Sequence, residues 1–173
     1  MACAVCGALG GGVPAWADLP SVSVSEETDL RFGSFAVFTG GWRAVGATGS
    51  QSSGGIMPVP GEPVGPAQFT VRYDRGTESS RPITVVLQLL LMPQSYVTKN
   101  GVTGQLSAFT TDLPGALPLV PGTAALVTLP SCTTRLCTLT FHVGARLDVT
   151  RSAGAAQKIS FNLPISAFVI SAL

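Results

Sequence analysis

The sequence predicts an all-β sandwich of about eight to ten short antiparallel strands in a single domain. Three observations predict it. Glycine and proline are abundant, at 20 and 13 of 173 residues, whereas charged residues make up only 11%. Turn-forming residues recur roughly every ten residues along the chain. Between these turns, several segments alternate apolar and polar side chains, which places one face of a strand on a core and the other in water.

The first 17 residues are expected to be an export signal. They are small and apolar and end in Ala-Trp-Ala, which fits the small-x-small pattern of a signal-peptidase site. No basic region precedes the apolar stretch, so the true start of the signal is expected upstream of Met1. The alternative is a buried N-terminal segment. Export would place the protein in the periplasm, at the cell surface or outside the cell, and Cys3 and Cys6 would be removed.

Residues 18–27 are expected to form an N-terminal strand extension ahead of the sandwich domain, residues 28–173. Within it, Val22 and Val24 alternate with serines, and Leu19 precedes them. Two interpretations stay open. The segment is the first strand of the domain's own sheet, or it is a donor strand that completes the sandwich of a neighbouring subunit. Leu19, Val22 and Val24 are therefore the candidate subunit-contact residues.

The remaining strands are predicted in chain order. An apolar run ends at Phe38 before a glycine pair, and residues 68–73, 137–143 and 158–163 alternate with a period of two. Residues 83–92 are apolar on both faces, which predicts a central strand whose second face is also covered. The segments predicted to be loops are rich in Gly, Ser or Pro: 46–55, 58–66, 112–122 and 152–156.

The order of these segments resembles a known family. The opening Leu30-x-Phe-Gly-Ser-Phe35, Ala67-Gln-Phe-Thr-Val71, and the late Phe141-x-Val-Gly-x-x-Leu-x-Val149 carry the likeness. They are similar to secreted domains of unknown function from Gram-negative bacteria, which are themselves similar to fimbrial, pilin-like subunits. The resemblance spans residues 28–173 and implies an immunoglobulin-like sandwich, export, and no established enzyme activity. Departures lie after Gly154, in the last strand, and in a cysteine pair that the resemblance does not imply.

The motif residues also have a physical interpretation. Phe32 and Phe35 are large enough to anchor the core. Gly33 and Gly144 lie inside strand patterns, where glycine usually marks a bulge or a close backbone approach. Together with Val143 and Leu147, they form a structural motif rather than a site.

Cys132 and Cys137 are predicted to form a disulfide. They are the only cysteines left after removal of the first 17 residues, and an even count in an oxidising compartment favours a bridge. A bridge closing so short a loop stabilises by roughly 2 kcal/mol in the chain-entropy model. The alternative is a metal pair, but the chain has only one histidine.

That histidine, His142, lies on the polar face of its predicted strand. A hydrolase triad needs a nucleophile and an orienting acid, and no GxSxG elbow accompanies His142. Scattered carboxylates, many in turn contexts such as Asp74, do not form a metal-ligand set. No catalytic residue, metal site or cofactor is expected, and the protein is not expected to be an enzyme. Arg72, Arg75 and Arg81, with Glu78, are predicted to form a solvated hairpin edge.

Charge and length exclude two classes of partner. Ten basic and nine acidic residues give a net charge of +1, which argues against nucleic-acid binding. No apolar stretch reaches the roughly 20 residues of a membrane-spanning helix. We expect an exported, non-enzymatic surface or fimbria-like structural subunit that associates with itself or with other surface subunits through strands or sheet faces. The alternative is a glycan- or partner-binding module acting through its loops, with Trp42 and Tyr96 as the loop-near aromatics.

Overall fold

The computed structural model describes residues 19–76, 81–94, 96–115, 118–153 and 158–173. These residues form ten strands and no helix, which confirms the all-β prediction. The strands are β1 (Ser21–Thr28), β2 (Arg31–Val45), β3 (Gln51–Gly65), β4 (Ala67–Asp74), β5 (Ile83–Leu91), β6 (Val97–Lys99), β7 (Val102–Thr111), β8 (Ala124–Cys132), β9 (Leu136–Arg151) and β10 (Ile165–Ala172). In the part of the chain that the structure describes, no helix could cross a membrane.

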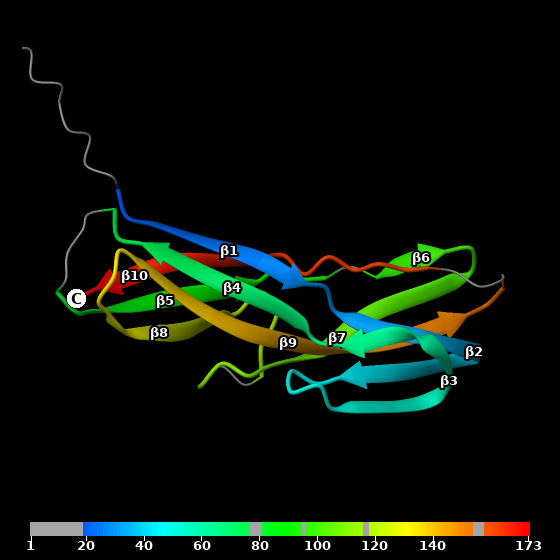
Figure 1. The fold of residues 1–173 in the computed structure, drawn as a ribbon. Coiled ribbons are helices and arrows are strands. Elements are labelled where there is room, and N and C mark those ends of the chain that lie inside the picture. Colours follow the sequence, from blue (N-terminus) through cyan, green and yellow to red (C-terminus); the bar gives the residue numbers. More distant parts are fainter. Residues whose placement is uncertain (1–18, 77–80, 95, 116–117, 154–157) are drawn as a thin grey trace, which may run out of the picture.

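The strands form two antiparallel sheets of unequal size (Figure 1). The large sheet has the order β1-β4-β9-β2-β3, with β7 also paired to β9 and β6 paired to β7. The small sheet has the order β10-β5-β8. β9 links the two halves of the large sheet, because it pairs first with β4 and then, further along, with β2 and β7. This two-sheet arrangement confirms the predicted sandwich.

The hydrophobic core lies between the two sheets. The large sheet contributes Phe69 and Val71 from β4 and Phe141 from β9, and the small sheet contributes Leu87 and Leu89 from β5. The rings of Phe69 and Phe141 stack with centroids 5.6 Å apart. The alternation predicted for residues 68–73 and 137–143 therefore places the expected side chains in the core.

Two motif glycines have the predicted roles. Gly33 has a positive φ of 66° and lies at a register shift between β2 and β3. Gly144 is buried where β9 approaches the chain after β2, and a Cβ there would collide with the carbonyl oxygen of Val45. Phe32 is buried, and the half-buried Phe35 packs against the core.

The predicted loops at 46–55 and 58–66 are wrong for most of their length. The chain turns at residues 46–50 and then runs as one 15-residue strand, β3. Among the described strands, β3 pairs only with β2, so its prolines do not remove hydrogen bonds from a second neighbour. Its glycines allow a close approach, because a Cβ at Gly54 would lie 2.7 Å from Trp42 Nε1.

The predicted strand at 158–163 is extended but is not a strand. Its alternation is as expected, because Leu163 is buried and Phe161 half-buried, whereas Ser160 and Asn162 are exposed. It forms no ladder with any described strand. We call residues 158–164, which lead into β10, the strap. Its apolar side chains, Ile159, Phe161 and Leu163, face the large sheet. The predicted loop at 112–122 is irregular where it is described, and most of 152–156 lies outside the described residues.

Candidate functional site

The outer face of the small sheet is an uncharged, exposed apolar surface. In β5, Val85, Leu87 and Leu89 point into the core, so the alternate residues point outward. These outward residues are Val86, Gln88 and Leu90. They form the central row of the outer face and are only half-buried. No residue of β5, β8 or β10 is charged. We call this surface the small-sheet face.

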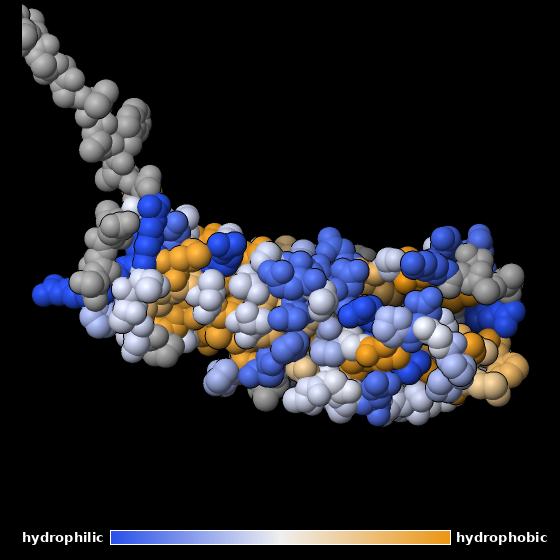
Figure 2. All heavy atoms as spheres, in the orientation of Figure 1, coloured by the Kyte–Doolittle hydropathy of each residue, from blue (hydrophilic) through white to orange (hydrophobic). Residues whose placement is uncertain are grey.

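Two large side chains flank the central row of the small-sheet face. Register places Phe168 of β10 and Leu126 of β8 on either side of Gln88. Phe168 is 53% exposed and Leu126 is 64% exposed. Figure 2 shows apolar atoms at the surface at the end of the molecule where β1, β4, β10 and β5 lie, next to more polar areas. Residues 83–91 form the central strand of the small sheet, as predicted, but the second face of this strand is only half-buried and not fully covered.

The small sheet also has two free edges. Within the described residues, β10 and β8 each pair only with β5, which leaves a row of backbone donors and acceptors on their far sides. β10 runs near β1 of the large sheet without pairing to it. β10 itself contains no proline or charged residue, although a register shift after Val169 interrupts its ladder with β5.

A groove of about 1210 Å³ lies between the strap and the large sheet. Its walls include Phe35 and Val37 of β2, Val102 of β7, Val149 of β9 and Phe161 of the strap. Among the described residues, no strand of the small sheet lines the groove, and the strap forms one of its walls. The volume is larger than the roughly 300–1,000 Å³ that ligand-binding clefts usually have.

Charged residues lie around the groove. Glu26 and Asp29 line it near the junction of β1 and β2, and Arg151 and Lys158 also line it. Burial, and then the nearby charge of Asp29, raise the pKa of Glu26. Arg151 donates a hydrogen bond to the carbonyl of Val37, 3.2 Å away. The groove therefore combines apolar walls with charges of both signs.

The predicted disulfide is present. Cys132 at the end of β8 and Cys137 at the start of β9 are bonded, with their Cα atoms 5.8 Å apart. Both cysteines are buried, and the bridge closes the tight turn between the two sheets. It is a structural clip rather than a reactive pair.

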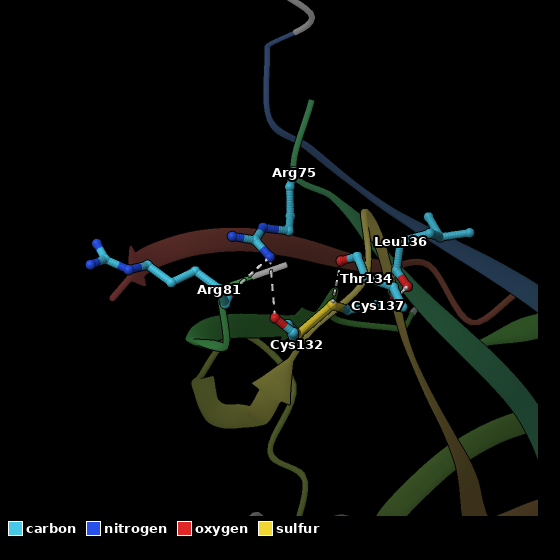
Figure 3. Close-up of a disulfide and its surroundings, with 6 residues drawn as sticks. All are labelled: Arg75, Arg81, Cys132, Thr134, Leu136 and Cys137. Atoms are coloured by element: carbon cyan, nitrogen blue, oxygen red, sulfur yellow. Dashed lines mark hydrogen bonds between the residues drawn. A yellow bond between two sulfur atoms is a disulfide. The ribbon is translucent and has the colours of Figure 1, made fainter. Parts of the chain in front are cut away.

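The prediction of a solvated hairpin edge is wrong for Arg75. Its side chain is buried, at 9% exposure, and Figure 3 shows it directed at the disulfide turn. It donates hydrogen bonds to the carbonyls of Arg81, at 3.0 Å, and Cys132, at 3.3 Å. Arg72 and Arg81 are exposed as predicted, whereas Glu78 lies outside the described residues. These hydrogen bonds compensate the free-energy cost of removing the guanidinium from water, which allows the arginine to be buried.

His142 is on the polar face of β9 as predicted, but it has an unpredicted partner. Its Nδ1 lies 2.7 Å from one oxygen of Asp112, and its backbone N–H donates to the other oxygen, also at 2.7 Å. Burial raises the pKa of Asp112, but these bonds to His142 outweigh burial and hold the pKa below its usual value. Because Asp112 lies 30 residues away in a turn, sequence alone did not connect the two. The pair is on an open sheet surface and does not line the groove.

Asp74 occupies the turn that its sequence predicts. It accepts a hydrogen bond from the backbone N–H of Gly76, and this bond, followed by the one from Arg135, lowers its pKa. No group of three or more potential metal ligands occurs among the residues that the structure describes.

The candidate subunit-contact residues lie in or just before β1, the strand at one edge of the large sheet. Val22 and Val24 are half-buried, pack against the core, and pair with Tyr73 and Val71 of β4. Leu19 precedes β1 and is 84% exposed. β1 is thus part of its own sheet in the described chain.

The two loop-near aromatics differ. Tyr96 is 67% exposed. Trp42 belongs to β2, is half-buried, and has the Arg146 guanidinium 4.5 Å from its ring centroid. Arg146 also bonds to Asp148, at 2.8 Å, so the indole is part of a polar cluster on the large sheet.

Comparison with known proteins gives one family. A model of a domain of unknown function, DUF4402, matches residues 22–163. The match runs from β1 to the strap and so includes both halves of the large sheet. No curated protein and no solved structure matches the chain. Because the family model covers most of the chain, the protein belongs to the DUF4402 family of domains of unknown function.

Proposed function

We propose that the chain is an exported, non-enzymatic structural subunit of the cell surface, fimbria-like in role, which associates with other subunits through its strands or sheet faces. The observation that carries this proposal is the small-sheet face. It exposes Phe168 and Leu126 around half-buried Val86 and Leu90, and it contains no charge. Contiguous exposed apolar surface on a folded domain marks an interaction site or an aggregation hazard.

The free edges of β8 and β10 support the same proposal. Edge strands pair readily with other chains unless proline, charge or covering segments prevent it. β10 has neither proline nor charge. A subunit that assembles on a surface has a use for such an edge, whereas a domain selected to stay alone is expected to block it.

Two further features support a structural rather than catalytic role. The disulfide at the turn between the sheets is typical of domains that fold in oxidising compartments. His142, the one histidine of the chain, is held by Asp112 on an open sheet surface and not in the groove. Neither arrangement resembles an activated nucleophile with a positioned base.

The test is to fractionate the native cells and run the unboiled surface material in detergent. We expect the chain in the exported fraction, accessible to added protease, and a ladder of multimers that collapses on boiling. A variant lacking residues 1–17 should stay inside the cell. A protein that is found in the cytoplasm, or that runs as a single monomer band from intact cells, would contradict the proposal.

The groove favours a second candidate function, a binding module for a surface partner. Its apolar walls and charged surroundings would suit a ligand with both characters. Phe161→Asp should weaken binding of the labelled chain to the surface of its native cells, whereas Thr138→Asp, at an exposed position of β9 that does not line the groove, should not. Equal binding by both variants would remove the groove from consideration.

A further inference from the structure

We infer that the small-sheet face is a self-association surface, and that its occupant is the same face of a second copy of this chain across a two-fold axis. This inference rests on the proposed function and names its surface and its partner. It makes the contact isologous, so that each copy contributes the same residues.

The first argument is the pattern of β5. A strand that is apolar on both faces is typical of one covered on both sides. The core covers Val85, Leu87, Leu89 and Leu91 completely, but Val86 and Leu90 remain half-buried. The composition of β5 thus matches a strand with two buried faces, whereas the single chain buries only one. A second copy supplies the missing layer.

The second argument is charge. The charged residues of the described strands all lie in the large sheet, for example Glu26, Arg43, Arg72 and Arg146, and none lies in β5, β8 or β10. A partner with a charged face would have to desolvate its charges against a surface that cannot pair them. The small-sheet face of a second copy has no charge to desolvate. Homodimer interfaces are likewise more apolar than other protein interfaces.

The third argument is size. Eight or nine residues per strand and three strands give a face of roughly 28 by 14 Å, at about 3.3 Å per residue and 4.8 Å between strands. Two such flat faces cover about 800 Å² in total, and the relief of the side chains adds to this area. The contact is therefore at or below the lower limit for specific stable interfaces, which predicts a weak, reversible dimer.

Gln88 can determine how the two faces align. It lies at the centre of the small-sheet face, with Phe168 and Leu126 beside it. Near a two-fold axis, it meets Gln88 of the second copy, and two side-chain amides can donate to and accept from each other. A central polar group of this kind can favour one alignment of an interface. Thr128 and Ser166, paired with Val86 and Leu90, are further polar members of the face, and neither is charged.

Sedimentation equilibrium of the full chain purified from its own cells tests the inference. We expect a reversible dimer, and for Phe168→Asp and for Leu126→Asp an increase in the dissociation constant of about 100-fold, because each buries an unpaired charge. The matched control is Phe38→Asp, because Phe38 is 73% exposed on β2 of the other sheet. Its dissociation constant should stay within a few-fold of the parent. All of these positions are exposed in the single chain, and circular dichroism should show that the variants fold.

A cysteine at Gln88 gives a second, geometric readout. In mild oxidant, Gln88→Cys should form a disulfide with itself in a second copy, because position 88 lies close to the axis in either orientation of the two strands. Thr138→Cys, exposed on the outer face of the large sheet, controls for random collision and should not cross-link.

The outcomes separate this inference from the proposed function. A chain that is monomeric at 100 µM and gives no self-cross-link at position 88 overturns the inference. So does a dimer that Phe168→Asp leaves intact. If multimers still appear on the cell surface in either case, the proposed function stands and another surface makes the contact. Loss of both the dimer and the surface multimers would refute both.

Discussion

At the scale of single residues, the closest approach of a backbone to any described glycine is at Gly144. A Cβ there would meet three backbone atoms: the carbonyl oxygen of Val45, the carbonyl carbon of Gly46 and the amide nitrogen of Ala47. Backbone atoms cannot rotate away as the end of a side chain can. Gly144→Ala should therefore lower the free energy of unfolding by about 3 kcal/mol, at the upper end for overpacking. Urea denaturation followed by tryptophan fluorescence would measure it.

A second glycine provides the control for Gly144. Gly65, at the end of β3, has no positive φ and would place a new Cβ in open space. Gly65→Ala should change the free energy of unfolding by no more than about 0.5 kcal/mol. If both alanine variants had equal stability, the close approach of β9 to the chain after β2 would not constrain position 144.

Asp112 makes stability depend on pH. The bonds from His142 lower its pKa in the folded state, so the folded chain binds the proton less readily than the unfolded chain. Its contribution is therefore fully present above the unfolded pKa of about 3.9, and is lost as the pH falls through the lower folded pKa. Asp112→Asn should lower the free energy of unfolding at pH 7 and pH 5 by less than about 1 kcal/mol, because the carboxylate and the side chain beside it are both partly exposed.

The pH series of Asp112→Asn has a distinctive shape. The difference between the parent and Asp112→Asn should shrink below pH 4 and vanish near pH 2, in urea denaturation at each pH. A difference that stays constant down to pH 2 would show that packing, rather than the carboxylate charge, explains the effect. Asp74, whose pKa is lowered by Gly76 and Arg135, adds to the acid sensitivity in the same direction and is unchanged in both chains.

At the scale of elements, the sequence predicted the strands whose side chains alternate between apolar and polar. The prediction failed for segments in which the presence or absence of a paired neighbour determines whether a strand forms. β4 and the first half of β9 have one face in the core, and their period of two was sufficient. β3 is rich in Gly, Ser and Pro, yet it forms a strand because it needs only β2 as a neighbour. The strap has the period of a strand but lacks a paired neighbour among the described residues. Neither the pairing of β3 nor the absence of a paired neighbour for the strap can be predicted from local composition.

Side-chain partners show the same limit. The disulfide could be predicted from the cysteine count, because residues 18–173 contain only two cysteines and so allow only one pairing. The burial of Arg75 could not be predicted in this way. It depends on the carbonyl of Cys132, which is 57 residues away in sequence. The link between Asp112 and His142 likewise needs the tertiary fold, which brings the turn after β7 beside β9.

β1 is the element whose role the sequence left open. In the structure it pairs with β4 through Val24 and Val71, and Val24 packs against the core. If this is its role in solution, Val24→Asp should lower the free energy of unfolding of the single chain by about 2 kcal/mol, because it buries an unpaired carboxylate. Ser23→Asp, exposed opposite Arg72, should change it by no more than about 0.5 kcal/mol.

The alternative role of β1 predicts the reverse pattern. A donor strand acts between chains, so Val24→Asp would leave the unfolding of the dilute monomer unchanged and would shorten the surface multimers. Urea denaturation at two protein concentrations, together with the unboiled ladder from cells, separates the two roles. Stable monomers without multimers would assign β1 to the neighbouring subunit.

At the scale of the whole molecule, the two sheets divide the chemistry between them. The large sheet carries the charged side chains of the strands, including the cluster of Trp42, Arg146 and Asp148. The small sheet carries none. A net charge of only +1 therefore hides a marked asymmetry between one polar side and one apolar side. In the proposed dimer, the small sheet makes the contact and the charged large sheet stays in water.

This asymmetry predicts how association should respond to salt. Between 0.1 M and 1 M NaCl the screening length falls from about 10 Å to about 3 Å, which removes most attraction between exposed charges. A dimer held by the small-sheet face contains no such pairs, so its dissociation constant should not rise over this range. Sulfate should lower it, because excluded salts strengthen apolar burial. Sedimentation equilibrium in each salt measures both effects. A dissociation constant that rose tenfold in 1 M NaCl would instead show that charged residues make the contact, which the small-sheet face does not contain.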